Sequence, residues 1–486
     1  MSPTSTESAI STDVLDALCA IVGKQGVLSA HEQVLVYECD GFVIEKNTPD
    51  CVVFPETTEQ VVAIVKLCNE HGIPFVPRGA GTSLAGGCLP VGGGVMIALT
   101  RMRGIHEVNL RDRYAVVGPG TVNVHLTQHL KGTGFHYAPD PSSQGACTIG
   151  GNVATNSGGP HTLKYGVTVN HVLGAEVVLP DGEVVQLGGY TEDNPGYDLT
   201  GLFVGSEGTF GVCTKVIVRL TRDPVAYRTM LGVFETVDDA TQAISDIIGA
   251  GIVPAALELM DQGIIEAVEA AFHFGFPLDA GAVLLIEVDG LEVAVDDEAA
   301  LIVELCGNNK AREVRKADSP EQRDLLWKCR KKAFGAIGRL SPSYCTQDGV
   351  VPRTKLPEIL KFITEAGARH DIRSVNVFHA GEGHLHPLLL FHERAAQIKR
   401  VLLASDEILT RCIELGGSVT GEHGIGVEKI NFMNKLFTEA DLETMEAVRI
   451  AFNPAGLCSP QKMLPTAGAC GMEHIEKSHP ARRAAL

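Results

Sequence analysis

The sequence predicts an α+β protein of two parts that meet near residue 224. A chain of 486 residues is too long for one hydrophobic core, and its length favours two or three domains. The first part is rich in glycine and ends in the β-rich run TKVIVRL. From Arg222–Pro224 onward, longer helical segments alternate with short β-rich runs, which indicates a sheet with helices on one face.

The first part contains short strands and a few helices. Residues 12–37 show helical spacing, and residues 51–54 are a short apolar run typical of a strand. Residues 58–70 follow a possible threonine cap with apolar side chains at helical spacing, which predicts a helix. The remaining expected elements are strands at 75–77, VMIAL and YAVVGPG, a helix near 122–131, and a hairpin around Pro-Asp-Gly at 171–187.

The second part alternates between segments with the periodicity of a strand and segments with the periodicity of a helix. Strands are expected at 229–234, 283–288, 312–316 and 375–378. Helices are expected at 237–250, 258–273, 291–306, 320–338, 396–415 and 438–451. The predicted domains are 1–224 with a core at about 45–224, then 225–465, then a polar C-terminal tail at 466–486.

The composition excludes several classes of protein. Lys and Arg number 40 against 59 Asp and Glu, a formal charge of -19, which disfavours binding to nucleic acid or to anionic lipid. No apolar run approaches the ~18–20 residues of a spanning helix. The first 23 residues contain no Lys or Arg and no apolar core, so neither a signal peptide nor a transit sequence is expected. We therefore expect a cytoplasmic protein.

The number and spacing of the cysteines also indicate a protein of a reducing compartment. The chain has 13 Cys, an odd number, and no C-x-x-C pair. This pattern argues against a disulfide framework and against an iron–sulfur cluster or zinc ribbon within the chain. Buried or idle thiols in a reducing compartment are the expected state.

The run RGAGTSLAGG, residues 78–87, is the first motif with chemical content. Its glycines leave room for backbone N–H groups to converge on an anion such as a pyrophosphate. It is not a G-x-G-x-x-G motif, because no long amphipathic helix and no acidic residue follow in the expected places, and it lacks the G-K-[ST] of a P-loop. On its own, such a run is more often a turn without a ligand.

Two further segments give this run its context: YAPDPSSQGACTIGGNVATNSGGPHTLKYG (137–166) and GYDLTGLFVGSEGTFGV (196–212). Their order resembles the FAD-binding domain of the vanillyl-alcohol oxidase/p-cresol methylhydroxylase superfamily, the FAD-linked oxidases. The phrases RKKAFGAIGRLSP, NVFHAGEGHLHP and GEHGIGVEKIN are most similar to the branch formed by the D-type subunit of glycolate oxidase, whose cousins are D-lactate and D-2-hydroxyglutarate dehydrogenases. The resemblance extends from about residue 40 to LPTAG.

The resemblance implies a two-part FAD-binding domain of the p-cresol methylhydroxylase type, then a cap domain with an antiparallel sheet and helices. Family members that attach FAD covalently often carry a His in the glycine run. Thr82 stands there in this chain, so the FAD is expected to be non-covalent. The implied FAD-binding residues are Arg78, Gly79, Gly81, Thr82, Ser83, Pro139, Asp140, Ser142, Ser143, Gly150, Asn152, Asn156, Ser157, Gly158, Glu207 and Gly208, the last two near the adenine half.

Histidines gather in two glycine-bordered segments, NVFHAGEGHLHP and GSVTGEHGIG. Loop histidines are more often surface residues than ligands, but metal ligands must converge from separate segments. The D-2-hydroxyglutarate dehydrogenase cousins hold a divalent metal with two His and one Glu, and His379, His386 and Glu422 match them. The likeness assigns the substrate's hydroxyl proton to His423. Family members commonly have HAGDGN where this chain has HAGEGH, so His384 and its neighbour Glu382 put the identity of the metal, zinc or manganese, in doubt.

Arg330 lies in the basic run WKCRKKAFGAIGRLSP. Such a run is usually a solvated helix face, yet a chain of charge -19 needs local cations to bind a carboxylate. Arg330 matches the carboxylate-binding arginine of the cousins. Phe334 replaces their Thr one turn later, and Thr346 or its neighbours replace their Lys. Both departures favour an acid smaller than 2-hydroxyglutarate.

The resemblance therefore implies FAD-dependent oxidation of a small 2-hydroxy acid, glycolate first and D-lactate next, by the catalytic subunit of a glycolate dehydrogenase/oxidase complex. Iron–sulfur and second flavin-type subunits are the implied partners, and any attachment to the inner face of the membrane would be made through them. The alternatives are a stand-alone D-lactate or D-2-hydroxyglutarate dehydrogenase, a flavin-bound subunit that mainly relays electrons or organises a complex, and a metal hydrolase without flavin.

Overall fold

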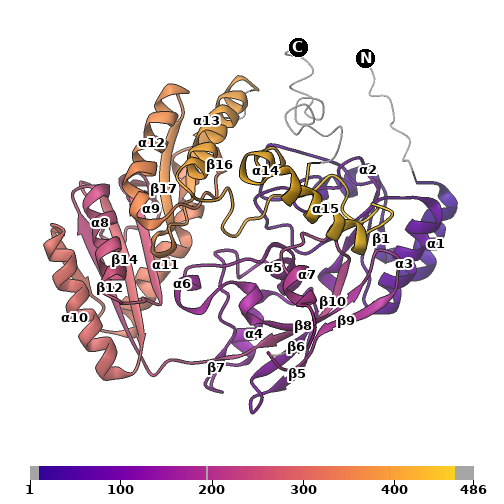
Figure 1. Cartoon of the computed structure of the whole chain (residues 1–486), viewed down its shortest axis with the longest axis horizontal. Coiled ribbons are helices and arrows are strands. Elements are labelled where there is room, and N and C mark those ends of the chain that lie inside the picture. The colour runs from indigo at the N-terminus through magenta and orange to yellow at the C-terminus, as the bar shows by residue number, and fades with distance from the viewer. Residues whose placement is uncertain (1–9, 193–194, 393–394, 466–486) are drawn as a thin grey trace. The chain divides into compact units, whose positions relative to one another are not determined.

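The computed structural model of the chain describes residues 10–192, 195–392 and 395–465 (Figure 1). These residues divide into two compact units. The second unit is formed by Gly158–Gly166 and Asp223–Glu422. The first is formed by the described residues up to Ser157, by Val167–Arg222, and by those from His423 onward.

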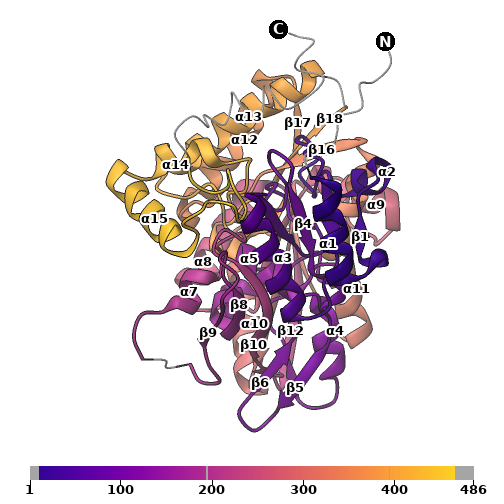
Figure 2. The same cartoon turned by 90° about the vertical axis from the view of Figure 1, so that its right-hand side faces the viewer.

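One sheet of the first unit has four strands in the order β1-β2-β4-β3. Strands β2, β4 and β3 are parallel, and β1 runs antiparallel to β2. Helices α1 and α3 lie side by side and share one hydrophobic core with this sheet (Figure 2). The bounds are α1 Thr12–Val22, β1 Val27–Leu28, β2 Cys51–Val53, α3 Thr58–His71, β3 Phe75–Arg78 and β4 Val95–Ala98.

The second sheet of this unit has five antiparallel strands in the order β5-β6-β10-β8-β9. Strands β8 and β9 form the hairpin that the sequence predicts. Its core takes in α4 and α5 through Leu126, Ile149 and Val153. The bounds are β5 Ile105–Asn109, β6 Tyr114–Val117, α4 Asn123–His129, α5 Ile149–Thr155, β8 Val172–Val178, β9 Val184–Gly188, α7 Leu199–Phe203, β10 Val212–Arg219, α14 Ile430–Leu436 and α15 Glu439–Phe452.

The second unit is built on one antiparallel sheet of seven strands, in the order β15-β12-β14-β13-β17-β18-β16. This is the antiparallel sheet with helices that the resemblance implies. Its strands are β12 Ala226–Phe234, β13 Ala256–Asp261, β14 Ala282–Gly290, β15 Glu313–Lys316, β16 Ser343–Thr346, β17 Arg373–His379 and β18 Pro387–Phe391. Its helices are α6 Thr162–Tyr165, α8 Val237–Gly249, α9 Gln262–Phe272, α10 Glu292–Asn308, α11 Pro320–Ala336, α12 Leu356–Arg369 and α13 Ala395–Glu414.

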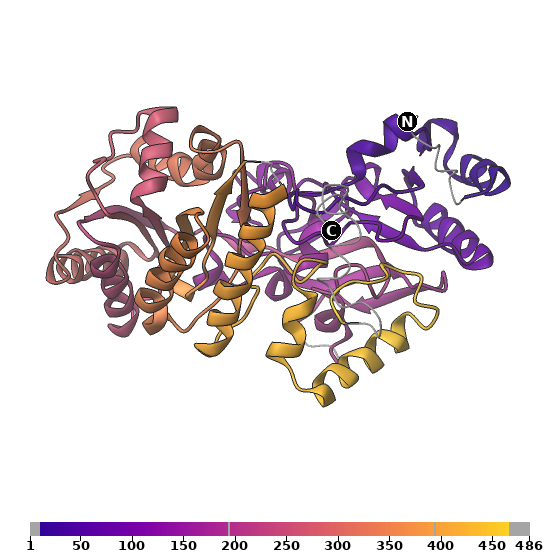
Figure 3. The ribbon, with the colours of Figure 1, turned by 90° about the horizontal axis from the view of Figure 1, so that it is seen from above.

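Helices cover both faces of this sheet, so the expectation of helices on one face is wrong. Leu231 and Val233 of β12 share a core with α9 and α11. Gly232 points to the opposite face, where a Cβ would lie 3.8 Å from Cys306 Sγ of α10. Helix α12 contacts strand β17, and helices α12 and α13 lie side by side (Figure 3). A sheet whose strands are apolar on both faces needs both faces covered.

Two helices have bounds that differ from those expected from the sequence. Residues 258–261 belong to β13 rather than to the helix expected at 258–273, and α9 begins only after Asp261, which caps it. This strand pairs on both sides, with β14 and β17, and those hydrogen bonds outweigh the helical spacing. The helical spacing over 12–37 breaks at Gly23, whose φ of +77° ends α1.

None of the helices within the described ranges is both long enough and apolar enough to cross a membrane. The polar tail expected from residue 466 lies outside these ranges, as do the first nine residues of the chain. The domain boundaries expected from the sequence stay a prediction.

Candidate active site

The glycine run of the first unit begins as β3 ends. Gly81 has a φ of +69°, and a Cβ there would lie 2.0 Å from Arg78 Nη2. The Arg78 guanidinium is buried and donates to Cys39 O at 3.0 Å, so it has little freedom to move away. A Cβ on Gly79 would lie 2.5 Å from Thr148 Oγ1, next to α5. The turn therefore requires glycine at both positions.

Apart from Gly158, which belongs to the second unit, the other residues implied for FAD belong to loops and short elements of the first unit. Asn152 lies in α5, where its Oδ1 accepts from Asn123 Nδ2 at 3.0 Å, and Asn156 ends that helix with a φ of 51°. Asn123 also donates to the carbonyl of Pro139, at 3.0 Å, which ties the 139–143 loop to α5. Pro139, Asp140, Ser142, Ser143, Gly150 and Ser157 follow one another along this loop and helix.

Two hydroxyl groups support the fit of this region to a polar cofactor. Ser83 Oγ, in the glycine run, and Ser206 Oγ, beside Glu207, are buried without a hydrogen-bond partner in the described part of the chain. Buried hydroxyls normally have partners, so both are candidates to bind a ligand oxygen. These hydroxyls and the glycines that admit no side chain, which we call the FAD cradle, are chemically suited to the phosphates and ribityl hydroxyls of FAD.

Glu207 has a partner of its own. Its carboxylate accepts the backbone N–H groups of Ile425 and Gly426, both at 2.7 Å. Burial raises the pKa of Glu207, against those two hydrogen bonds and the nearby Lys429 and Lys462, which lower it. Glu207 thus binds the backbone of residues 425–426, which belong to the same unit, a contact that the resemblance does not imply.

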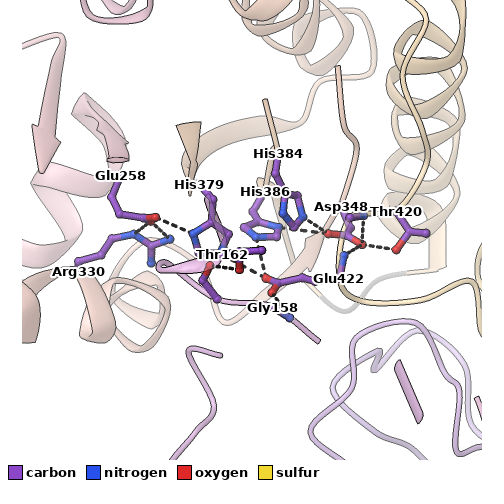
Figure 4. A network of polar contacts seen from close by, with 12 residues as sticks. Gly158, Thr162, Glu258, Arg330, Asp348, His379, His384, His386, Thr420 and Glu422 are labelled. Carbon is purple, nitrogen blue, oxygen red and sulfur yellow. Dashed lines mark hydrogen bonds and ion pairs between the residues drawn. The ribbon is translucent and has the colours of Figure 1, made fainter. Parts of the chain in front are cut away.

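The second unit brings His379, His386 and Glu422 together (Figure 4). His379 ends β17, His386 directly precedes β18, and Glu422 lies in the segment after α13. Glu422 Oε1 is 3.3 Å from His379 Nε2 and 3.2 Å from His386 Nε2. Zinc ligands at about 2.0–2.1 Å in a tetrahedral site lie about 3.3–3.4 Å apart, so these two separations are close to those in a zinc site, and the three donor atoms all lie within 4.8 Å of one another.

The outer nitrogen of each ring faces an acceptor. His379 Nδ1 is 2.7 Å from Glu258 Oε1, and His386 Nδ1 is 3.4 Å from the carbonyl of Gln347. An acceptor at Nδ1 favours the tautomer with a lone pair on Nε2. In that tautomer both lone pairs would be available to a metal ion, on the same side as Glu422 Oε1.

The charges around these rings favour a cation at this point. Burial lowers the pKa of His379, but Glu258 and Glu422 raise it by more, to about 10. Burial raises the pKa of Glu422, but hydrogen bonds with His379 and His386 outweigh it and hold this pKa well below its usual range.

Glu258 and Arg330 extend this cluster. Both are fully buried, and Glu258 Oε2 accepts from Arg330 Nε at 2.6 Å, with Nη2 at the same distance. Arg330 thus lies on the buried face of α11, not on the solvated face that its basic run suggested. Glu258 was not predicted from the sequence. The available signal was a lone acidic residue inside an apolar strand, which must be paired if it is buried.

Asp348, which was also missed, organises the other side of the cluster. One of its oxygens pairs with His384 Nε2, and the other accepts from Thr420 Oγ1 and the backbone N–H of Gly421. His384 is therefore engaged by Asp348 rather than by Glu422. Burial lowers and Asp348 raises the pKa of His384, with a net rise.

Two further predicted residues border the cluster. The backbone N–H of Gly158 donates to Glu422 Oε2 at 3.1 Å, so this end of the glycine-rich 137–166 segment belongs to the second unit. The Phe334 ring is 6.3 Å from the ring of His386, between centroids. His423 directly follows Glu422 in the chain and is grouped with the first unit, and its catalytic role stays a prediction.

Two family models match the chain. Residues 49–188 match the FAD binding domain, and residues 224–463 match the C-terminal domain of FAD linked oxidases. The chain is 43% identical to glycolate oxidase subunit GlcD of Escherichia coli K12, covering 96% of this chain and 95% of that protein. It is 38% identical to GlcD of Bacillus subtilis 168 over 93% and 97% of the two chains.

More distant relatives also match the chain over most of its length. A D-lactate dehydrogenase of Anaerostipes hadrus is 32% identical over 89% of this chain and 92% of its own. The crystal structure of p-cresol methylhydroxylase superposes with a TM-score of 0.79, at 17% identity, over 93% of this chain and 96% of that one, which shows a shared fold. The FAD cradle, the FAD-binding match and these relatives lead to one conclusion. The chain belongs to the FAD-linked oxidases and is an FAD-dependent oxidoreductase.

Proposed function

We propose that this protein oxidises a small 2-hydroxy acid to the 2-oxo acid, with glycolate the favoured substrate and D-lactate the next. The observation that carries the proposal is the 43% identity with glycolate oxidase subunit GlcD over nearly the whole chain. The cluster of Arg330, His379, His386 and Glu422 supports it, because it offers one buried cation and one set of metal-type ligands.

The reaction removes two hydrogens from the substrate. FAD, when bound, accepts the α-hydrogen with its electron pair. Arg330 binds the carboxylate, and His423 takes the hydroxyl proton, which leaves the C=O bond of the 2-oxo acid. His379, His386 and Glu422 would hold a divalent metal, zinc or manganese, which supplies a Lewis acid for the hydroxyl oxygen.

Phe334 argues for a small acid. It lies one helical turn after Arg330 and its ring approaches His386, so it fills space that a longer substrate would need. This favours glycolate or lactate over 2-hydroxyglutarate. A stand-alone D-lactate dehydrogenase is the second candidate, because D-lactate dehydrogenases are among the relatives at 32% and 30% identity.

Electron transfer completes the proposal. The FAD is held without a covalent bond, since Thr82 cannot form a histidyl link. An iron–sulfur subunit and a second flavin-type subunit would take up the electrons that FAD, when bound, accepts from the substrate, because the chain has no C-x-x-C pair for a cluster of its own. The complex is cytoplasmic, and any attachment to the membrane is made by those partners.

Dye reduction with a panel of acids tests the substrate. We expect the FAD-loaded chain to reduce an artificial dye fastest with glycolate, more slowly with D-lactate and least with D-2-hydroxyglutarate, and to reduce oxygen poorly. The highest kcat/KM with D-2-hydroxyglutarate would overturn the substrate assignment. Rapid peroxide formation by the isolated chain would overturn the need for partners.

A further inference from the structure

Glu258 joins the two halves of the candidate site. One carboxylate oxygen pairs with Arg330, through Nε and Nη2 at 2.6 Å, and the other contacts His379 Nδ1 at 2.7 Å (Figure 4). The carboxylate is fully buried on the face of the sheet that packs against α9 and α11, between Ala256 and Met260. A buried carboxylate that serves two different functional groups fixes both at once.

We propose that Glu258 is the positioning residue of the site, which orients Arg330 toward the substrate carboxylate and His379 toward the metal. This inference rests on the proposed function and adds a residue that none of the sequence motifs contains. Glu258 itself touches neither substrate nor metal in this account.

The effect on His379 follows from the tautomer. An ionised carboxylate can only accept, so Glu258 keeps the proton of a neutral His379 on Nδ1. The lone pair is then on Nε2, 3.3 Å from Glu422 Oε1, where the metal would bind. Carboxylates that hold ligand histidines in this way raise metal affinity by about 10- to 100-fold.

The effect on Arg330 is directional. Glu258 Oε2 accepts from Nε and lies 2.6 Å from Nη2 as an ion pair, while Nη1 and Nη2 are both buried without a hydrogen-bond partner among the described residues. A buried guanidinium N–H rarely lacks an acceptor, so Nη1, which has no ion-pair contact with Glu258, is the group left to bind a carboxylate oxygen. Without Glu258 the guanidinium would lose its fixed orientation.

A purely structural ion pair is the competing explanation, and the chain contains a matched example. Glu287 is also fully buried on this face of the sheet and also pairs with α11, through Arg323 at 2.8 and 2.7 Å and Trp327 at 2.8 Å. Within the described part of the chain, its hydrogen bonds and ion pairs do not involve His379 or Glu422. Glu287→Gln therefore reproduces the loss of a buried charge without touching the proposed metal ligands.

The test compares Glu258→Gln with Glu287→Gln in the full-length, FAD-loaded protein. A glutamine amide has one acceptor and one donor, so with its oxygen on Arg330 its N–H group faces His379 Nδ1 and no longer holds the lone pair of His379 on Nε2. Titration with Mn²⁺ alone, followed by EPR of the free ion, should show affinity ~10- to 100-fold weaker for Glu258→Gln. Its KM for glycolate should also rise. Glu287→Gln should lose thermal stability while keeping the Mn²⁺ affinity and KM of the wild type.

Glu258→Asp provides a second variant if Glu258→Gln does not fold. It keeps the charge on a shorter side chain that cannot reach both partners, so an intermediate Mn²⁺ affinity is expected. Wild-type Mn²⁺ affinity and KM in either folded variant would overturn the proposal. A wild type that binds neither Mn²⁺ nor Zn²⁺ would overturn it too, whereas reduction of its flavin by glycolate would leave the proposed function standing.

Discussion

Arg330 is a fully buried guanidinium whose pairing with Glu258 leaves Nη1 unoccupied by the described chain. If Arg330 binds the substrate carboxylate, Arg330→Lys should lower kcat/KM for 2-hydroxy acids, by an amount that corresponds to ~2–4 kcal/mol of activation free energy. The reason is that a lysine cannot pair with Glu258 and also present a second donor face to the substrate. Arg323→Lys, which changes the neighbouring ion pair of α11, is the control and should leave kcat/KM unchanged. Normal kcat/KM in Arg330→Lys would reduce the arginine to a structural role.

His423 is the predicted general base. Replacement by Asn preserves hydrogen bonding but not proton uptake, so anaerobic flavin reduction by glycolate should slow by ~10²–10⁴-fold. Stopped-flow spectroscopy measures this rate, and FAD and metal contents should match those of the wild type. If flavin reduction stays at the normal rate, the base lies elsewhere.

At this scale, the sequence was informative where residues belong to a motif. His379, His386 and Glu422 come from two segments 36 residues apart, counting from His386 to Glu422, and the structure places their ligand atoms within 4.8 Å of one another. Glu258 and Asp348 belong to no spacing pattern. Their roles arise from strand pairing and from a turn, which bring distant segments together, so only the three-dimensional structure reveals them.

The element that defines the cofactor region is the turn between β3 and the rest of the glycine run. Gly81→Ala should lower FAD occupancy at least ~10-fold, because the backbone there has a φ of +69°, which residues other than glycine disfavour, and because the added Cβ would meet the Arg78 guanidinium. Gly145→Ala is the control, since a Cβ at Gly145 meets nothing within 4 Å. Acid precipitation releases non-covalent FAD to the supernatant for measurement. Full FAD content in Gly81→Ala would contradict this account of the turn.

Among the elements, those with strong local signals were predicted well. The helix at 58–70 and the hairpin at 171–187 correspond to α3 and to β8 with β9. The strand β13 was mistaken for the start of a helix, because its neighbours β14 and β17 are supplied by remote parts of the chain. Local periodicity carries no information about such partners.

The molecule as a whole carries buried carboxyls whose ionisation opposes folding. Burial raises the pKa of Asp40, in the first unit, and of Asp261, in the second, to about 6. A raised carboxyl pKa means that the stabilising contribution is complete below the unfolded-state pKa, near 3.8, and is lost as the pH rises through about 6.

Asp40→Asn tests this dependence. The unfolding free energy of the wild type relative to the variant should fall by about 2 kcal/mol between pH 4.5 and pH 7, since the unfolded carboxyl ionises first. Urea unfolding of the FAD-saturated proteins at the two pH values gives the difference. A difference that does not change with pH would show that the pKa of Asp40 is not raised.

The central claim is that a 2-hydroxy acid delivers its hydrogens to the FAD of this chain. Its most direct test is an anaerobic titration of the purified, FAD-loaded protein with glycolate, followed through the visible flavin band. We predict complete bleaching of this band and one 2-oxo acid formed per FAD reduced. A flavin that dithionite bleaches but that glycolate, D-lactate and D-2-hydroxyglutarate all leave oxidised would contradict it.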